Sequence, residues 1–309
     1  MHNALQKQNK NWEVSDILEL GMEQYIARYG YPFADQAKVV KALKDCRTSN
    51  MGGHSYHCDT CVYEKNAYNS CRNRHCPKCQ GMARLKWVEC RMEELLPVQY
   101  FHCVITVPSE LNPFALRNKE PFYDILQKVA GETLAELSQD PNHIGGKTGY
   151  ISALHTWGQN LLDHPHVHCI IPGGGLNEQK EWVSCKEDFL FPLKVVSRLF
   201  KGKFMAKFKE RVKNGDIKFH GKLKEFTDYS TWKHFINLLY EKEWIVYCKE
   251  PFGGPEQVLK YLGGYTHRIA IANHRILDVK NGVVSFFWKD HAAGGIKKVM
   301  KLSIVEFIR

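Results

Sequence analysis

The chain has 309 residues, of which 44% are hydrophobic and 12% aromatic, enough to build a real core and to exclude intrinsic disorder. It has no run of about 18 apolar residues, and MHNALQKQNKNWE lacks the apolar stretch of a signal peptide, so we expect a soluble, cytoplasmic protein with no membrane contact. The 43 basic residues outnumber the 33 acidic ones, and this net charge of +10 favours a polyanion, most commonly nucleic acid, as partner.

In chain order, the first elements are predicted helices. Apolar residues recur at helical spacing over 15–46 and again over 81–97, where Pro97 ends the helix. The window between these helices is rich in Cys, His, Gly and Asn and has no helical periodicity. We therefore predict a separate N-terminal domain over 1–97.

After Pro97 the pattern changes to strands interleaved with helices. Apolar, β-branched runs predict strands at YFHCVITVP, YISALHTWGQN, HPHVHCIIP and EKEWIVYCKEPF, and a hairpin of THRIAIANHRILDV and GVVSFFWKD around Lys280-Asn281-Gly282. Helical patterns cover PFYDILQKVAGETLAELSQ, 193–213, 229–241 and PEQVLKYLGGY. This arrangement predicts an α+β fold with an antiparallel sheet over 98–309.

Six of the eleven cysteines lie within 46–79, and such clustering in a cytosolic chain indicates metal binding. Cys58-x-x-Cys61 and Cys76-x-x-Cys79 each predict a knuckle with two thiolates, and two knuckles complete a closed structural zinc site. Four further residues of zinc-ligand type lie in this window: Cys46, His54, Cys71 and His75. They predict a second zinc site, in which His57 could replace His54; the alternative is that they only pack or contact DNA.

Basic residues surround the knuckles and predict a surface that follows DNA phosphates; they are Arg72, Arg74, Lys78 and Arg84. A closed zinc site has no open position, so this part of the chain is expected to bind rather than catalyse. The five scattered cysteines are expected to be small core residues; they are Cys90, Cys103, Cys169, Cys185 and Cys248.

The stretch LLDHPHVHCIIPGGG places His166 and His168 on one side of a strand, about 7 Å apart, where both can reach one metal ion. One His-x-His pair is expected by chance in such a chain, so a third ligand is needed. His155 on the preceding strand lies opposite His166 if the hairpin turn centres on Asn160-Leu161. Gln159 is the fallback ligand, and a structural role is the alternative for His155.

Tyr261 and Tyr265 are four residues apart in VLKYLGGYTHR and share a face on a helix, which makes them nucleophile candidates. Two packed core tyrosines are the ordinary explanation, but the adjacent Gly263 and Gly264 disfavour a core helix. HIGGKTG lacks the first glycine of a P-loop, so no nucleotide cofactor is expected.

These segments together carry a resemblance: NSCRNRHCPKCQ, HTWGQNLLDHPHVH, YLGGYTHR, FFWKD and KLSIVEFIR. The chain resembles transposases of the insertion-sequence-91 family, rolling-circle enzymes of the HUH (His-hydrophobic-His) superfamily. The resemblance implies a helical, zinc-ribbon-like N-terminal domain and an HUH nuclease fold, whose central five-stranded antiparallel sheet has flanking helices. It also implies a chain shortened at its C-terminus, since these transposases continue past EFIR.

The resemblance implies Tyr261 and Tyr265 as catalytic residues and His166 and His168 as ligands of a catalytic Mg²⁺ or Mn²⁺. His155 as third ligand rests on the strand geometry and on similar histidine spacing in conjugative relaxases. The implied reaction is metal-dependent cleavage and rejoining of single-stranded DNA at transposon ends and target DNA through a 5′-phosphotyrosine.

Such a protein would be associated with the nucleoid. Candidates for holding the DNA strand are Arg268, Arg275 and the basic helix 198–213. The alternative for the helix is a solvated basic face. The alternatives are a replication initiator or relaxase with the same chemistry, and a non-enzymatic zinc protein that binds DNA. Convergence of the histidines and tyrosines in space would favour an enzyme over such a binder.

Overall fold

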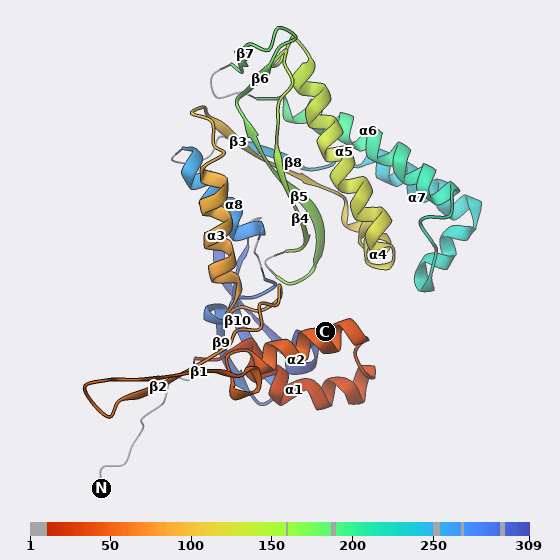
Figure 1. Ribbon diagram of the computed structural model, residues 1–309. Coiled ribbons are helices and arrows are strands. Elements are labelled where there is room, and N and C mark those ends of the chain that lie inside the picture. The colour runs from red at the N-terminus through yellow and green to blue at the C-terminus, as the bar shows by residue number, and fades with distance from the viewer. Residues whose placement is uncertain (1–10, 159, 187–189, 250–253, 267–268, 291–293) are drawn as a thin grey trace. The chain divides into compact units, whose positions relative to one another are not determined.

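The computed structural model describes residues 11–158, 160–186, 190–249, 254–266, 269–290 and 294–309 (Figure 1). The chain divides into two compact units. The first contains the chain up to Lys86, a short piece ending at Leu161 and the C-terminal residues up to Arg309, and the second contains 87–158 and 162–266. The predicted boundary at residue 97 falls within the second of these units, and the C-terminal residues belong to the first.

The first unit is built on α1 (Val14–Tyr29) and α2 (Ala34–Asp45), followed by η1 (Ser49–Met51), the hairpin β1 (Gly53–His57) and β2 (Glu64–Tyr68), and the start of α3 (Gln80–Met92). The C-terminal helix α9 (Ile304–Ile308) packs on α1. A Cβ at Gly21 of α1 would lie 2.6 Å from the Ile304 side chain, so glycine permits this close approach. The terminal residues are thereby tied to the first helix.

A three-stranded antiparallel sheet completes the first unit, in the order β11-β10-β9. It consists of β9 (Ile276–Lys280), which follows η4 (Asn273–Arg275), β10 (Val283–Asp290) and β11 (Ile296–Ser303). The predicted hairpin around Lys280-Asn281-Gly282 is present, and its turn consists of Asn281 and Gly282, both with the positive φ that a two-residue turn of this kind requires. One face of this sheet packs on α1 and α9 through a small core that includes Ile17, Val284, Phe286 and Ile304.

The second unit contains a four-stranded antiparallel sheet in the order β4-β5-β3-β8. Its strands are β3 (Tyr100–Thr106), β4 (Ile151–Trp157), β5 (Asp163–Pro172) and β8 (Val246–Lys249), and β6 (Gly174–Leu176) and β7 (Trp182–Ser184) form a separate hairpin. The predicted α+β class with antiparallel sheets is confirmed. Among the described residues this sheet has four strands, one fewer than the resemblance implied.

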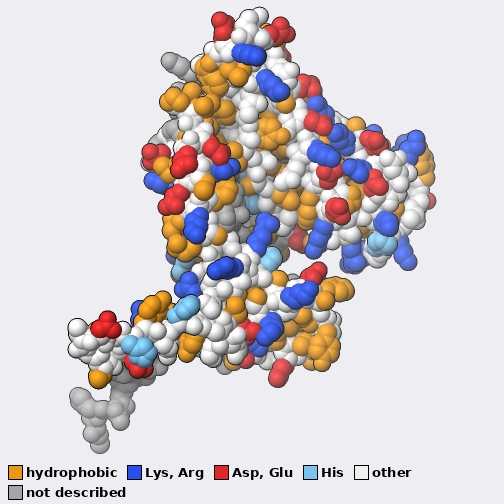
Figure 2. Space-filling view, in the orientation of Figure 1, with side chains coloured by type: hydrophobic (Ala, Val, Ile, Leu, Met, Phe, Trp, Pro, Cys, Tyr) orange, Lys and Arg blue, Asp and Glu red, His pale blue; other side chains and the backbone are white. Residues whose placement is uncertain are grey.

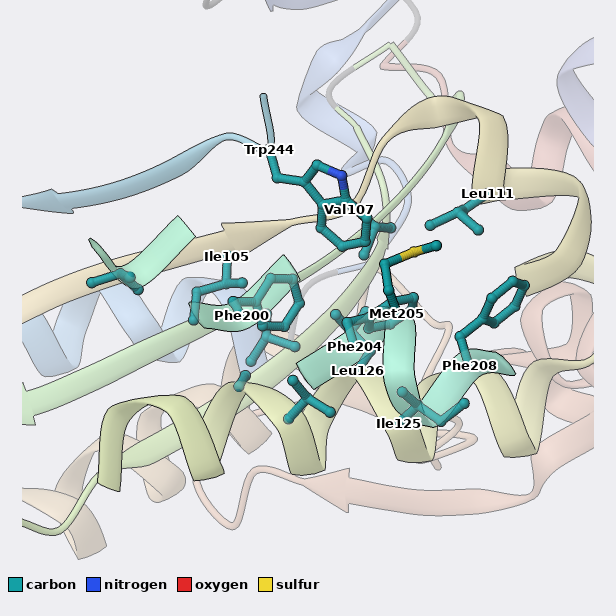
Figure 3. Packing of buried hydrophobic residues seen from close by; sticks show 14 of the residues in the cluster. Ile105, Val107, Leu111, Ile125, Leu126, Phe200, Phe204, Met205, Phe208 and Trp244 are labelled. Atoms are coloured by element: carbon teal, nitrogen blue, oxygen red, sulfur yellow. The ribbon is translucent and has the colours of Figure 1, made fainter. Parts of the chain in front are cut away.

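The helices of this unit are η2 (Ser109–Leu111), α4 (Asn112–Arg117), α5 (Lys119–Gln139), α6 (Leu193–Lys213), η3 (Gly221–Thr227), α7 (Tyr229–Glu241) and α8 (Pro255–Thr266). In Figure 1, α5 and α6 lie on one side of the sheet and α8 on the other. Phe200, Phe204 and Phe208 repeat every four residues and form one buried stripe of α6. Figure 3 shows this stripe packed against Leu126 of α5 and Ile105 of β3.

Alternation along the strands gives the sheet two different faces. Phe101, Cys103 and Ile105 of β3 face the large core, as do Val167 and Cys169 of β5. The residues between them point to the opposite face, toward α8, and these include three buried histidines: His102, His166 and His168. The core thus fixes the strands that present a polar cluster on their other face.

The basic helix 193–213 is α6, and three of its eight basic side chains pair with acidic residues of α5. Lys203, Lys207 and Arg211 form ion pairs with Glu136, Glu132 and Asp124 of α5. Figure 2 shows basic and acidic side chains interspersed over this part of the surface. For these three side chains, the ion pairs agree with a solvated face, which was the alternative to a role in holding DNA.

The cysteine prediction for the sheet was wrong at two positions. Cys103 and Cys248, expected as ordinary core thiols, lie directly opposite each other on β3 and β8 and form a disulfide. Cys169 is buried as expected, whereas Cys90 is exposed. Across the described ranges, none of the helices combines the length and apolar character needed to cross a bilayer.

Candidate functional site

Three histidines converge on the face of the sheet that points toward α8. His155 of β4 is the register partner of His166 on β5, as predicted, and His168 lies two residues further along β5 on the same face. One ring nitrogen from each lies within 4.8 Å of the others, and all three residues are buried. The predicted hairpin register is therefore confirmed, and Leu161 in the turn has a positive φ of 66°.

Contacts of the Nδ1 atoms orient two of these rings. His166 Nδ1 lies 2.5 Å from the His164 carbonyl, which can only accept, so this nitrogen carries the proton and donates. His168 Nδ1 lies 2.8 Å from Nε2 of His102. With Nδ1 engaged in both rings, Nε2 is the nitrogen that each can present to a metal ion.

His102 of β3 is a member of this cluster that the sequence analysis missed. Its ring stacks on that of His168 with centroids 5.1 Å apart, and burial lowers its pKa to about 4. It is therefore neutral at ordinary pH, and its Nε2 can accept the proton that His168 must carry on Nδ1 in order to use Nε2 as a ligand. The alternation of side chains along β3 could have revealed His102. Val104 of β3 lies opposite His168, and His102, two residues before Val104, points to the same face of the sheet.

The tyrosine helix packs against the histidine face. α8 contacts β3, β4 and β5, and the Tyr261 ring meets His102 edge-on, with centroids 5.2 Å apart. Tyr261 is 50% exposed, so it adjoins the cluster while remaining accessible. Tyr265 lies one turn further along α8, and its side chain is outside the described residues, as is Gln159.

The three imidazoles of the histidine cluster suit some metal ions better than others. Three imidazoles without a carboxylate are the donors that first-row transition ions prefer, whereas Mg²⁺ prefers oxygen ligands. Three protein ligands also leave coordination positions for water or substrate, as in catalytic rather than structural sites. The histidine cluster is thus a candidate metal site with an open side.

A second cluster lies in the first unit and consists of cysteines only. The Sγ atoms are separated by 3.5 Å for Cys46–Cys76, 3.6 Å for Cys46–Cys79 and 3.7 Å for Cys71–Cys79. Tetrahedral zinc with Zn–S bonds of about 2.3 Å requires sulfur separations of about 3.8 Å, so these four thiols fit the ion. Burial raises the pKa of the Cys71 thiol to about 11, and a bound zinc would overcome this by stabilising the thiolate.

This arrangement corrects the predicted grouping of zinc ligands. Cys76 and Cys79 join Cys46 and Cys71, whereas Cys58 and Cys61 are exposed beyond β1, in the turn of the β1–β2 hairpin. The fourteen residues between the two Cys-x-x-Cys pairs include β2, which carries the first pair away from the second.

The remaining predicted zinc ligands also lie outside the cysteine cluster. His54 and His75 are exposed, and His57, the alternative to His54, forms an ion pair of 3.0 Å with Glu64. The Cys58 Sγ lies 3.2 Å from the Thr60 hydroxyl, and hydrogen bonds from Thr60 and Cys61 lower its pKa to about 7. The second predicted set is therefore divided, with its two cysteines in the cluster and its histidines outside.

The residues predicted to contact DNA differ in their surroundings. Arg72, Arg74 and Arg84 are exposed, and Arg268 lies outside the described residues. Lys78 instead pairs with Glu13 at 2.6 Å, and Arg275 donates to the Phe287 carbonyl. The last two side chains are engaged within the first unit.

Together these features define an α+β protein with a buried three-histidine cluster beside a tyrosine helix and with a separate four-cysteine cluster. Comparison with family models identifies the class further. Residues 17–107 match the model described as "Transposase zinc-binding domain", and residues 149–309 match the one described as "Putative transposase". The chain belongs to the insertion-sequence-91 family of transposases, as the resemblance implied.

Two curated relatives support this assignment. The chain is 43% identical over 298 residues to the "Putative transposase y4qJ" of Sinorhizobium fredii, which covers 96% of this chain and 75% of the relative. It is 26% identical over 262 residues to the "Transposase for insertion sequence element IS801" of Pseudomonas savastanoi pv. phaseolicola, covering 83% of this chain and 61% of that protein. The chain thus spans about three fifths to three quarters of their lengths.

Two solved structures of the conjugative relaxase TrwC in complex with oriT DNA are also similar to part of the chain. One is described as copper-bound and covers 53% of this chain and 68% of its own, with 9% identity and a TM-score of 0.28. The other contains a mutant oriT DNA and covers 52% and 64%, with 11% identity and a TM-score of 0.27.

Proposed function

We propose that this transposase cleaves and rejoins single-stranded DNA through a covalent phosphotyrosine, with Tyr261 as the first nucleophile. The observation that carries the proposal is the edge-on contact of Tyr261 with His102, which in turn bonds to His168 of the histidine cluster. A half-exposed hydroxyl-bearing side chain beside a metal site is the arrangement that nucleophilic attack on a phosphodiester needs.

The tyrosine oxygen would attack phosphorus in line with the 3′-oxygen of the strand. A P–O bond to Tyr261 forms, the bond to the 3′-oxygen breaks, and the proton lost by the phenol balances the one that the 3′-hydroxyl gains. Because the phosphodiester energy is kept in the protein–DNA link, the reverse reaction can join the strand to a new 3′-hydroxyl without a nucleotide cofactor. Tyr265, one turn away on α8, is proposed to receive the second strand.

The histidines would hold a divalent cation that polarises the scissile phosphate, and Mn²⁺ is better suited than Mg²⁺ to three imidazole ligands. His155, His166 and His168 supply the nitrogen atoms. His164 and His102 fix the two rings of β5 by accepting their Nδ1 protons. The buried position of the cluster keeps these rings in one orientation.

The cysteine cluster is proposed to hold one structural zinc ion, with Cys46, Cys71, Cys76 and Cys79 as ligands. The exposed Arg72, Arg74 and Arg84 lie on or next to the segment that the zinc would fold, so they can contact the DNA backbone. The DNA partners proposed are the element's two ends and the target. A zinc protein that only binds DNA would have no use for a tyrosine helix on the histidine face, which favours the enzyme.

A covalent-adduct assay tests this proposal. Single-stranded oligonucleotides that span each end of the element carry a label at the 3′ end, because the 5′-phosphate side of the cut stays on the protein. Reactions contain Mn²⁺, Mg²⁺ or EDTA and the wild type, Tyr261→Phe, Tyr265→Phe or the double variant. Tyr229→Phe, an exposed tyrosine at the start of α7, is the matched control.

We expect a denaturant-resistant labelled adduct that requires the divalent ion, is lost in the double variant and is unchanged in Tyr229→Phe. Peptide mapping of the adduct should identify a residue of α8. DNA binding without an adduct, under every metal and with both ends supplied, would refute the cleavage function and support a DNA-binding role alone.

A further inference from the structure

The sheet of the first unit has an outer face with an unusual composition. The small core covers the face of Val284 and Phe286, so the alternate residues of β10 point outward: Val283, Ser285, Phe287 and Lys289. Their register partners on β11 are Ser303, Lys301, Val299 and Lys297. Lysines thus flank a central apolar pair at both ends of the face.

The ring of Phe287, at the centre of this face, makes a cation–π contact with Lys297. Lys297 Nζ lies 3.7 Å from the centroid of the Phe287 ring, and Val299, directly opposite Phe287, is 50% exposed. Lys297 covers one side of the ring, and Phe287 itself is only partly buried, so part of the ring remains accessible beside positive charge. This combination is how proteins bind single-stranded nucleic acid, by stacking a base on an aromatic ring while basic side chains follow the backbone.

Charge on this face is strongly one-sided. Lys289, Lys297 and Lys301 are all exposed, and among the strand residues of the face the acid is Asp278, which forms an ion pair of 3.0 Å with Lys280. Lys297 and Lys301 are four residues apart on one strand, or about 14 Å. A row of positive charge this long spans more than one phosphate of an extended strand.

We propose that the outer face of β10 and β11 is a second binding surface for single-stranded DNA, in which a base stacks on Phe287 and Lys289, Lys297 and Lys301 contact phosphates. Both strands belong to the first unit, whereas the histidines and Tyr261 belong to the second. The surface goes beyond the proposed cleavage chemistry, since it needs neither the metal nor the tyrosines.

The test is equilibrium binding of the full chain to fluorescein-labelled oligo(dT) of 20 nucleotides, in EDTA so that no cleavage intervenes. The variants are Lys289→Gln/Lys297→Gln/Lys301→Gln, Phe287→Leu and Phe287→Tyr. The matched control is Lys38→Gln/Lys41→Gln/Lys44→Gln on α2, because it removes the same charge from lysines that each pair with an acid.

We expect the sheet triple variant to reduce the slope of log Kobs against log salt by about 2, from about 0.7 per lost contact, while the α2 triple variant changes it far less. Phe287→Leu should weaken binding by about 5- to 150-fold, which is the range of base stacking, and Phe287→Tyr should retain it. Thermal unfolding of each variant shows whether a loss of binding reflects a loss of folding.

Three outcomes would overturn the proposal. In the first, both triple variants change the salt slope equally, which would mean that only net charge matters. In the second, Phe287→Leu binds as the wild type does. In the third, Phe287→Leu loses binding to a 20-base-pair duplex by the same factor as binding to the single strand. As a check independent of folding, oligo(dT) with 5-iododeoxyuridine should crosslink on illumination to the peptide that contains Phe287.

Discussion

The two clusters of metal-ligand side chains differ in what they leave open. Cys46, Cys71, Cys76 and Cys79 supply four thiols at mutual distances that enclose a tetrahedral ion completely. The histidine cluster supplies three rings, so a bound ion would keep positions for an outside ligand. The first arrangement can only stabilise structure, whereas the second can take part in a reaction.

The clusters also differ in how the chain supports them. The cysteines come from the end of α2 and from the irregular segment that leads to α3, where the protein has few core residues of its own. The histidines lie on two neighbouring strands whose opposite face is packed against α5 and α6. A zinc ion is thus expected to fold the segment around the cysteine cluster. The histidine cluster, in contrast, is positioned by the packed sheet before any metal binds.

The largest effect is therefore expected from Cys76→Ser. Structural zinc in small sites contributes roughly 10–16 kcal/mol of binding free energy, which exceeds the stability of many domains, so loss of one ligand should release zinc and unfold the segment 46–80. Zinc content measured with a chromogenic chelator and amide hydrogen exchange over this segment check the result.

Cys58→Ser is the matched control for this experiment and also tests the grouping of ligands. Cys58 lies in the exposed hairpin turn, outside the cluster, so this variant should retain zinc and protection from exchange. Equal zinc loss from both variants would show that the hairpin cysteines are ligands, as the sequence analysis had predicted, and that the four-cysteine cluster is not the site.

The next largest effect is expected from His155→Ala. A bound metal ion lowers the barrier of phosphoryl transfer by several kcal/mol, so removing one of three ligands should reduce adduct formation on the order of a thousandfold. Zinc content and the unfolding temperature of the first unit should not change, since the cysteine cluster is separate. Unchanged adduct formation would mean that His155 is the buried structural histidine considered as the alternative.

A smaller loss is expected from His102→Gln. His102 does not belong to the ligand set but accepts the Nδ1 proton of His168, and partners of this kind typically contribute about 10- to 100-fold in metal affinity or activity. His102→Asp, which supplies a carboxylate acceptor in the same direction, should recover part of the loss. Titration with Mn²⁺, followed by the enhancement of water-proton relaxation on binding, separates a loss of metal affinity from a loss of folding. Metal affinity in His102→Gln equal to that of the wild type would rule out this positioning role.

Strand and helix positions followed closely from the sequence, because each pattern depended on local periodicity. The helices 193–213 and 229–241 have the predicted bounds, and the pairing of His155 with His166 followed from the length of one hairpin. Periodicity decides which face a residue occupies, so the histidine cluster could be assembled from two adjacent strands without knowing the rest of the fold.

Predictions failed where residues far apart in the chain had to be matched. Cys76-x-x-Cys79 pairs with Cys46 and Cys71 instead of with Cys58-x-x-Cys61, because a hairpin intervenes, and spacing alone does not reveal its direction. His102 was missed since its strand is separated from β5 by some 60 residues and becomes its neighbour only in the sheet. The packing of the C-terminal strands with α1 depends on the same kind of distant contact.

The smallest effect is expected from His164→Ala. His164 supports His166 through its backbone carbonyl, which alanine retains, whereas His102 supports His168 through its side chain. Although the His164 ring lies 4.9 Å from that of His166, we expect less than about a threefold change in metal affinity and adduct formation. A loss as large as that of His102→Gln would show that the His164 imidazole itself binds the ion or the phosphate, and the open side of the histidine cluster would then be narrower than the three-ligand arrangement implies.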